Sequence, residues 1–158
     1  MRITTIVFPI QGQNVFLANK KDGFGVGFLN GYGGKQKPID TTIDDTAIRE
    51  LEEEAGAVAS KRDLEKVAVI DFFEGEVHLY ECHIYFCRRW AGDLRETEEM
   101  GFPELHSMSN MPFDRMWHAD KTWIPLVFSG QKIRAKSHYD TGMKKQVCFE
   151  YEPLKEVA

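Results

Sequence analysis

Residues 31–57 read GYGGKQKPIDTTIDDTAIRELEEEAGA, a glycine-rich loop and one acidic helix around which the remaining chain is arranged. Thr42 is a suitable N-cap because its hydroxyl can accept a backbone hydrogen bond, and Asp45 holds the reciprocal capping position. Gly56 can adopt the left-handed conformation that ends many helices. The stretch therefore predicts an α-helix over about residues 43–55.

Three glutamates share one face of this predicted helix. At about 100° per residue, Glu53 and Glu54 lie within about 60° of Glu50. Glu52 points away from that face. The apolar residues of the helix lie beside the carboxylates, so we expect the three acids at the edge of the buried seam. Arg49 precedes Glu53 by one helical turn and can hold that carboxylate in position.

Like charges on one helix face destabilise the helix, and a divalent cation can offset the repulsion. Mg²⁺ suits such a site because it binds a few carboxylates, waters and substrate phosphates. Gly31, Gly33 and Gly34 allow positive φ and a close approach of the backbone to a ligand, so the loop can line a phosphate-metal pocket. The alternative is a solvated acidic helix after an ordinary turn, since glutamate runs are common on exposed helices.

Composition and charge narrow the class of protein. The 158 residues include 42% hydrophobic side chains, enough for one well-packed domain over residues 1–158. The net charge of −5 argues against a nucleic-acid polymer or an anionic membrane as partner, since both require a basic surface. Cys82, Cys87 and Cys148 lack metal-site spacing, and an odd number cannot all pair within the chain. With no signal peptide or long apolar run, we expect the reducing cytoplasm.

The rest of the chain reads mainly as strands. Residue type and alternating polarity predict strands at 2–10, 14–18, 66–73, 76–90, 132–138 and 145–151. Pro9 is expected to end the first strand. Residues 20–30 read as a glycine-rich loop, residues 93–100 as a second acidic cluster in a loop, and residues 120–129 as a late helix. These elements predict an α/β fold, an α/β/α sandwich with a mixed β-sheet.

A family resemblance lies in the acidic helix itself. Residues 49–57, RELEEEAGA, fit the second half of the Nudix signature, Arg-Glu-apolar-x-Glu-Glu-x-Gly-apolar, so the chain resembles the Nudix hydrolase family. The first half departs from the pattern, because counting from Gly34 reaches Asp40 one residue too far from Arg49. A one-residue insertion in the loop accounts for this spacing, with Asp40 in place of the usual glutamate.

Segments outside the signature resemble one Nudix branch, the oxidised-purine nucleoside triphosphatases of the 8-oxo-dGTPase type. They are residues 20–25 (KKDGFG), 30–35 (NGYGGK), 96–100 (ETEEM), 112–117 (PFDRMW) and 123–126 (WIPL). The resemblance implies a Nudix-type sandwich that hydrolyses oxidised or otherwise modified purine nucleoside triphosphates to the monophosphate and pyrophosphate. It also implies a small-molecule nucleotide as the partner, and we expect a monomer.

The resemblance also implies a metal site. Its expected ligands, for Mg²⁺ or for Mn²⁺ as a substitute, are Glu50, Glu53, Glu54 and Glu99, with backbone contacts from Gly34. The same four glutamates are the candidate catalytic residues. Glu53 or Glu54 is the expected base that takes a proton from the attacking water.

The purine base is expected in a pocket formed by Thr5, Phe24, Asn30, Trp117, Asp120 and Trp123. An aromatic ring can stack on a purine, while amide and carboxylate groups bind its edge; core packing is the alternative for the two tryptophans. The family carries two adjacent acids where this chain has Ala119 and Asp120. A rival function is therefore hydrolysis of another nucleoside diphosphate derivative, such as a methylated or unmodified purine triphosphate or a dinucleotide. A catalytically silent nucleotide-binding module is the other alternative.

Overall fold

Helix α1 (Ile43–Ala55) begins and ends where its capping residues predict. The Thr42 hydroxyl accepts a hydrogen bond from the Asp45 backbone N–H at 3.3 Å, and the Asp45 carboxylate accepts one from the Thr42 N–H at 2.9 Å. Gly56 follows the helix in the left-handed conformation, with φ of 75°. The predicted helix and both of its caps are confirmed, because all three depend on residues that are neighbours in sequence.

The computed structural model describes residues 1–23 and 25–155. Within these ranges the strands are β1 (Arg2–Gln11), β2 (Asn14–Asn19), β3 (Leu29–Asn30), β4 (Leu64–Glu74), β5 (Val77–Cys87), β6 (Glu104–Ser107), β7 (Ile133–Tyr139) and β8 (Gln146–Pro153). The second α-helix is α2 (Asp120–Phe128), and two 3₁₀ turns are η1 (Lys61–Asp63) and η2 (Phe113–Arg115). Among the helices described, none has the length and apolar character needed to cross a membrane.

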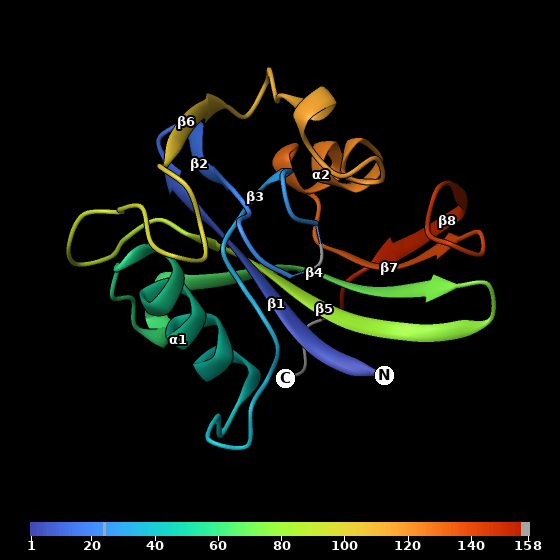
Figure 1. The fold of residues 1–158 in the computed structure, drawn as a ribbon, viewed down its shortest axis with the longest axis horizontal. Coiled ribbons are helices and arrows are strands. Elements are labelled where there is room, and N and C mark those ends of the chain that lie inside the picture. The colour runs from blue at the N-terminus through green and yellow to red at the C-terminus, as the bar shows by residue number, and fades with distance from the viewer. Residues whose placement is uncertain (24, 156–158) are drawn as a thin grey trace.

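The strands form one mixed sheet in the order β3-β2-β1-β5-β4-β7-β8, with β6 paired to β2. β1 runs parallel to β5 and β4 runs parallel to β7, whereas the other pairs are antiparallel. Figure 1 shows α1 and α2 on opposite sides of this sheet. The predicted sandwich of helices around a mixed sheet is therefore confirmed.

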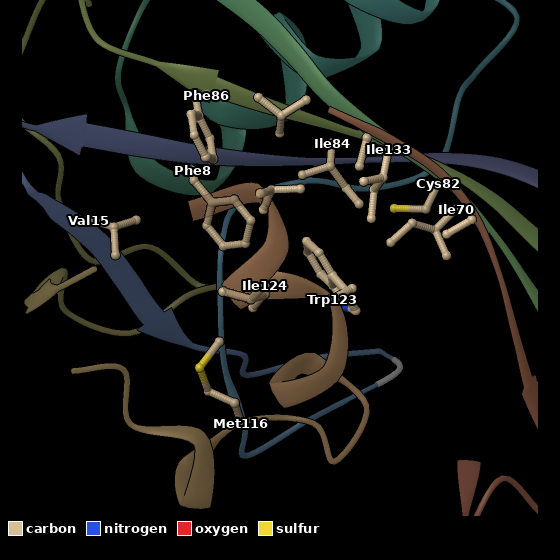
Figure 2. Packing of buried hydrophobic residues seen from close by; sticks show 14 of the residues in the cluster. Phe8, Val15, Ile70, Cys82, Ile84, Phe86, Met116, Trp123, Ile124 and Ile133 are labelled. Carbon is tan, nitrogen blue, oxygen red and sulfur yellow. The ribbon is translucent and has the colours of Figure 1, made fainter. Parts of the chain in front are cut away.

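Two apolar clusters bind the helices to the sheet, and they use alternate residues of the same strands, as the two-residue period of a strand requires. Phe8 of β1 packs in the α2 cluster with Trp123 and Ile124, whereas Val7 packs in the α1 cluster with Leu51. Figure 2 shows Phe8, Trp123 and Ile124 meeting in the α2 cluster. Each fully buried large side chain of this kind contributes about 1.5–3 kcal/mol to folding.

The six predicted strands are present, with ends that differ by up to three residues, but two strands were not predicted. One of them is β3, whose two residues lie in the stretch 20–30 that was read as a loop. β1 does not end at Pro9 but continues to Gln11. Pro9 is the last residue of β1 in register with β5, and the antiparallel pairing with β2 begins at Ile10, so its missing N–H falls where the partner changes. β6 was not predicted, because its four residues, Glu-Leu-His-Ser, carry no strong strand pattern.

Candidate active site

Three carboxylates from two distant segments meet beside α1. Glu50 and Glu54 lie one helical turn apart on α1, with 6% and 4% of their surface exposed. Glu99 comes from the segment between β5 and β6 and is exposed. One carboxylate oxygen from each of the three lies within 4.8 Å of the others. This is a set of hard oxygen donors of the kind that Mg²⁺ or Mn²⁺ binds in proteins.

The electrostatics of this cluster favour a bound cation. Burial raises the pKa of Glu54 to about 8, and the negative charge of Glu50 adds to the effect. Burial also raises the pKa of Glu50, against the opposing influence of Arg49. Glu54 accepts a hydrogen bond from the Gly33 N–H at 2.7 Å. Two buried carboxylates side by side are costly when both are ionised, and a divalent cation removes that cost.

The glycine loop lies against β1 and α1 at very short range. A Cβ atom on Gly33 would stand 1.8 Å from the Thr5 carbonyl oxygen, and one on Gly34 would stand 2.5 Å from a Glu50 carboxylate oxygen. Neither glycine has positive φ. Gly31 does not have positive φ either, so of the two properties for which these three glycines were singled out, only the close approach of the backbone applies. Glycine is needed there because a strand and a carboxylate leave no room for a side chain.

Arg49 fixes the loop to the helix. Its Nε and Nη2 donate to the two carboxylate oxygens of Asp40, each at 2.8 Å, in a two-pronged ion pair. This pair holds the pKa of Asp40 well below its usual range. Arg49 Nη1 also donates to Glu50 at 2.9 Å and to Glu53 at 3.2 Å. Asp40 thus anchors the loop in which the sequence predicts an inserted residue, and the expected contact between Arg49 and Glu53 is present.

Glu53 is placed differently from the other predicted metal ligands. Its side chain is 43% exposed and bonded to Arg49, and it is not part of the compact group of Glu50, Glu54 and Glu99. Glu52 is exposed as well, as the helical geometry predicts. The structure therefore divides the predicted acids into a buried pair, a loop acid and one more exposed acid on the same helix.

A cavity of about 500 Å³ opens directly onto the carboxylates. Five of the six predicted base-pocket residues line it: Thr5, Asn30, Trp117, Asp120 and Trp123. The sixth, Phe24, lies outside the described residues. The acids Glu50, Glu54 and Glu99 line the same cavity. One continuous space thus joins the predicted metal site to the predicted base pocket.

The aromatic and acidic residues of the pocket are held by packing. Trp117 donates from Nε1 to the Tyr139 hydroxyl at 2.9 Å, and the Phe28 ring meets it edge-on. Trp123 is 1% exposed and packs in the core, and it also lines the cavity. Burial raises the pKa of Asp120 to about 7, so this carboxyl can donate or accept a hydrogen bond near neutral pH.

Several lining residues were not among the predicted site residues. They are Lys20, Phe72, Tyr80, Cys82, Met100 and Tyr139. Phe72 and Tyr139, from the parallel strands β4 and β7, stack with ring centres 6.2 Å apart. The alternation of side chains along these strands was the available signal, but it becomes useful only when strand order and register are known.

The buried carboxyl group of Glu54 predicts an unusual pH dependence of stability. Without metal, the free energy of unfolding is expected to fall as pH rises from about 4.5 to about 8. In this window the folded chain holds a proton on Glu54 that the unfolded chain releases, so rising pH favours unfolding. Urea unfolding in a chelator at several pH values measures the slope. Glu54→Gln should reduce the slope to the part that the raised pKa values of Glu50 and Asp120 contribute. An unchanged slope in that variant would contradict the explanation.

Comparison with known proteins identifies the family. Residues 1–127 match the NUDIX domain. Together with the sandwich fold and the glutamates of α1, this match shows that the chain belongs to the Nudix family.

Two curated relatives carry the same description, oxidized purine nucleoside triphosphate hydrolase. The mouse (Mus musculus) protein is 40% identical over 133 residues, which are 84% of this chain and 83% of that protein. The zebrafish (Danio rerio) protein is 36% identical over 133 residues, with the same coverage of both chains.

Solved structures share the fold at lower identity. The MutT protein of Bacillus halodurans superposes with a TM-score of 0.79 at 17% identity, over 98% of this chain and 100% of that one. A bifunctional NMN adenylyltransferase/ADP ribose pyrophosphatase of Francisella tularensis, complexed with AMP and a manganese ion, has a TM-score of 0.63 at 18% identity. The match covers 81% of this chain and 41% of the Francisella chain.

Proposed function

We propose that this chain is a Mg²⁺-dependent Nudix hydrolase that cleaves oxidised or otherwise modified purine nucleoside triphosphates to the monophosphate and pyrophosphate. One observation carries the proposal: Glu50, Glu54 and Glu99 open into the cavity that Trp117 and Asp120 also line. A nucleotide in that cavity can place its phosphates at the acids and its base at the aromatic end. The two curated relatives, each described as an oxidized purine nucleoside triphosphate hydrolase, support this substrate class.

In the proposed site Glu50, Glu54 and Glu99 would hold the divalent cation. Glu53 and the Gly34 backbone would add further contacts to it. When bound there, Mg²⁺ would neutralise charge on the phosphates and would lower the pKa of the attacking water. The buried pair is suited to this role because Gly33 and Arg49 fix one oxygen of each carboxylate. Mn²⁺, with similar oxygen preference, is the expected substitute.

The hydrolytic step needs a base from the same helix. Water attacks the α or the β phosphorus, the anhydride bond between these two phosphates breaks to give the monophosphate and pyrophosphate, and a carboxylate takes the proton of the water. Glu53 and Glu54 are the two candidates. Arg49 orients Glu53 from one side, and the Gly33 N–H orients Glu54. Both carboxylates can therefore present a fixed oxygen to water.

The base pocket supports purine recognition. Stacking of a base on an aromatic ring such as Trp117 is worth about 1–3 kcal/mol. Asn30 and Asp120 supply polar groups for the edge of the base, and Asn30 is fixed because its Oδ1 accepts from the Gly31 N–H at 2.8 Å. Ala119 offers only a methyl group beside Asp120 and is fully buried. This difference is the observation that favours the second candidate, a Nudix hydrolase for another modified or unmodified purine nucleoside diphosphate derivative.

The composition of the chain supports proposals on the binding partner, the oligomeric state and the compartment. The chain carries a net charge of −5, which suits a small nucleotide bound through a cation and opposes a nucleic-acid polymer or an anionic membrane. We propose one domain that works as a monomer in the cytoplasm.

A substrate panel tests the proposal. With Mg²⁺ present, 8-oxo-dGTP, 2-hydroxy-dATP and O6-methyl-dGTP are compared with dGTP by kcat/KM, and the products are separated by chromatography. We expect the monophosphate and pyrophosphate, and at least about a tenfold preference for one modified purine, the worth of one hydrogen bond to its edge. Equal kcat/KM for dGTP and all modified bases favours the second candidate. No turnover of any nucleotide favours the silent module.

A further inference from the structure

The C-terminal end of α1 is capped by the segment that carries Glu99. The last turn of a helix leaves carbonyl groups without partners inside the helix. Here the Arg95 N–H donates to the Ala55 carbonyl at 2.9 Å, and the Thr97 hydroxyl donates to the Glu54 carbonyl at 2.8 Å. The segment is therefore bonded directly to the backbone of a residue whose side chain belongs to the metal site.

The Thr97 hydroxyl joins two parts of that site. While it donates to the Glu54 carbonyl, its oxygen accepts from the backbone N–H groups of Glu99 and Met100, each at 3.3 Å. The Thr97 N–H also donates to the Met100 carbonyl at 2.9 Å, which closes a tight turn around Glu99. One side-chain oxygen thus links the helix that carries Glu54 to the turn that carries Glu99.

Lys21 holds the same turn from the other side. Its backbone N–H donates to the Glu99 carbonyl at 2.9 Å. Its Nζ donates to the Thr97 carbonyl at 2.9 Å and pairs with Glu96 at 2.7 Å. Glu99 is exposed and far in sequence from α1, so these contacts set its distance from the two buried acids.

We infer that Thr97 is a positioning residue that places Glu99 against Glu54 and so sets the affinity of the site for its divalent cation. The inference rests on the proposed function, because it assumes that the three carboxylates bind the cation. Residues that orient metal ligands commonly change metal affinity by 10- to 100-fold when they are replaced. A ligand on an exposed turn needs such support more than one on a helix, since the turn must otherwise be ordered when the cation binds.

The test is a Mg²⁺ or Mn²⁺ titration of the nucleotide-free protein by calorimetry. Thr97→Val removes the hydroxyl but keeps the shape, and is expected to weaken cation binding by about tenfold. Thr97→Ser keeps the hydroxyl and should bind within about twofold of the unchanged protein. Thr122→Val is the matched control. It removes a half-buried hydroxyl that donates to Gln146 at 2.9 Å, so it should affect thermal stability but leave cation affinity unchanged.

A double variant separates positioning from general destabilisation. If Thr97 acts through Glu99, Thr97→Val should have no further effect on cation affinity once Glu99→Gln is present. Equal losses in both backgrounds, or a Thr97→Ser protein as weak as Thr97→Val, overturn the inference. An unchanged affinity in Thr97→Val overturns it too while leaving the proposed function intact. If the unchanged protein binds neither cation, the proposed metal site and the inference both fall.

Discussion

Glu54→Gln is expected to lower kcat by at least about 10²-fold while the protein stays folded. The amide keeps the shape of the side chain and can still accept the hydrogen bond from Gly33, but it cannot carry the negative charge. Because burial raises the pKa of Glu54 to about 8, the substitution also removes a buried ionisable group. The metal-free variant should therefore be at least as stable as the unchanged protein near pH 8.

Two measurements on Glu54→Gln follow from this. Turnover of the best nucleotide with Mg²⁺ gives the loss of kcat. Thermal unfolding with and without about 10 mM Mg²⁺ gives the loss of binding, because a cation that binds only the folded state raises Tm. The unchanged protein should show a clear rise in Tm, and the variant should show little. A variant with normal turnover and a normal rise in Tm would remove Glu54 from the site.

Glu53 and Glu52 complete this comparison. Glu53→Gln tests the more exposed candidate for the base, and a large fall in kcat with a preserved Mg²⁺ effect on Tm would assign the proton transfer to it. Glu52→Gln is the matched control, because Glu52 is on the same helix, is exposed, and points away from the cluster. It should change neither kcat nor Tm appreciably. Loss of activity in this control would mean that any change on α1 is harmful.

Gly33→Ala is the second substitution with a large expected effect. The new Cβ would lie 1.8 Å from the Thr5 carbonyl oxygen and 2.5 Å from its carbonyl carbon, so β1 or the loop must move. Backbone atoms cannot rotate away as a flexible side chain can. We expect a loss of about 3 kcal/mol in the free energy of unfolding. A shift of about 1 Å at a catalytic group can cost about 10²-fold in rate, and the Gly33 N–H holds Glu54, so kcat should fall similarly.

The control for this variant is Gly101→Ala. A Cβ atom on Gly101 would meet its nearest neighbour, the Asn19 Cβ, at 3.5 Å, which is an ordinary contact, and Gly101 does not have positive φ. Denaturant unfolding should place this control within about 1 kcal/mol of the unchanged protein, as for substitutions that create no clash. A Gly33→Ala protein that unfolds like this control and keeps its turnover would contradict the role given to the loop.

The sequence predicts those features of the structure that depend only on residues close together in the chain. The bounds of α1 and its caps follow from spacing along a single helix, and the structure reproduces both. The same spacing brings Glu50 and Glu54 together, whereas Glu53 is more exposed and is bonded to Arg49. The place of Glu99 does not follow from spacing, because it depends on a turn that reaches α1 from beyond β5. For that residue the family resemblance supplied the expectation, and the hydrogen bonds of Thr97 supply the physical reason.

The predictions for Pro9 and for the two glycines were incomplete for one reason, which is a contact with a distant part of the chain. Pro9 obeys the rule that proline cannot donate within a sheet, yet β1 continues past it because a new partner takes over at Ile10. Gly33 and Gly34 were singled out partly because glycine allows positive φ, but they are needed because another strand and Glu50 lie close. In each case the sequence identifies the residue that matters. Its role depends on a contact with a segment that is distant in the chain.

Trp123 lies in the core and in the cavity wall at once, so a substitution there that alters substrate preference also affects stability. Its ring meets Phe8 at a centre-to-centre distance of 6.1 Å and also forms a wall of the cavity proposed for the nucleotide. Removing such a ring costs about 3–5 kcal/mol, which is a large share of the stability of an ordinary domain. New specificities in related sequences should therefore arise at wall positions outside the apolar core, such as the half-buried Asn30.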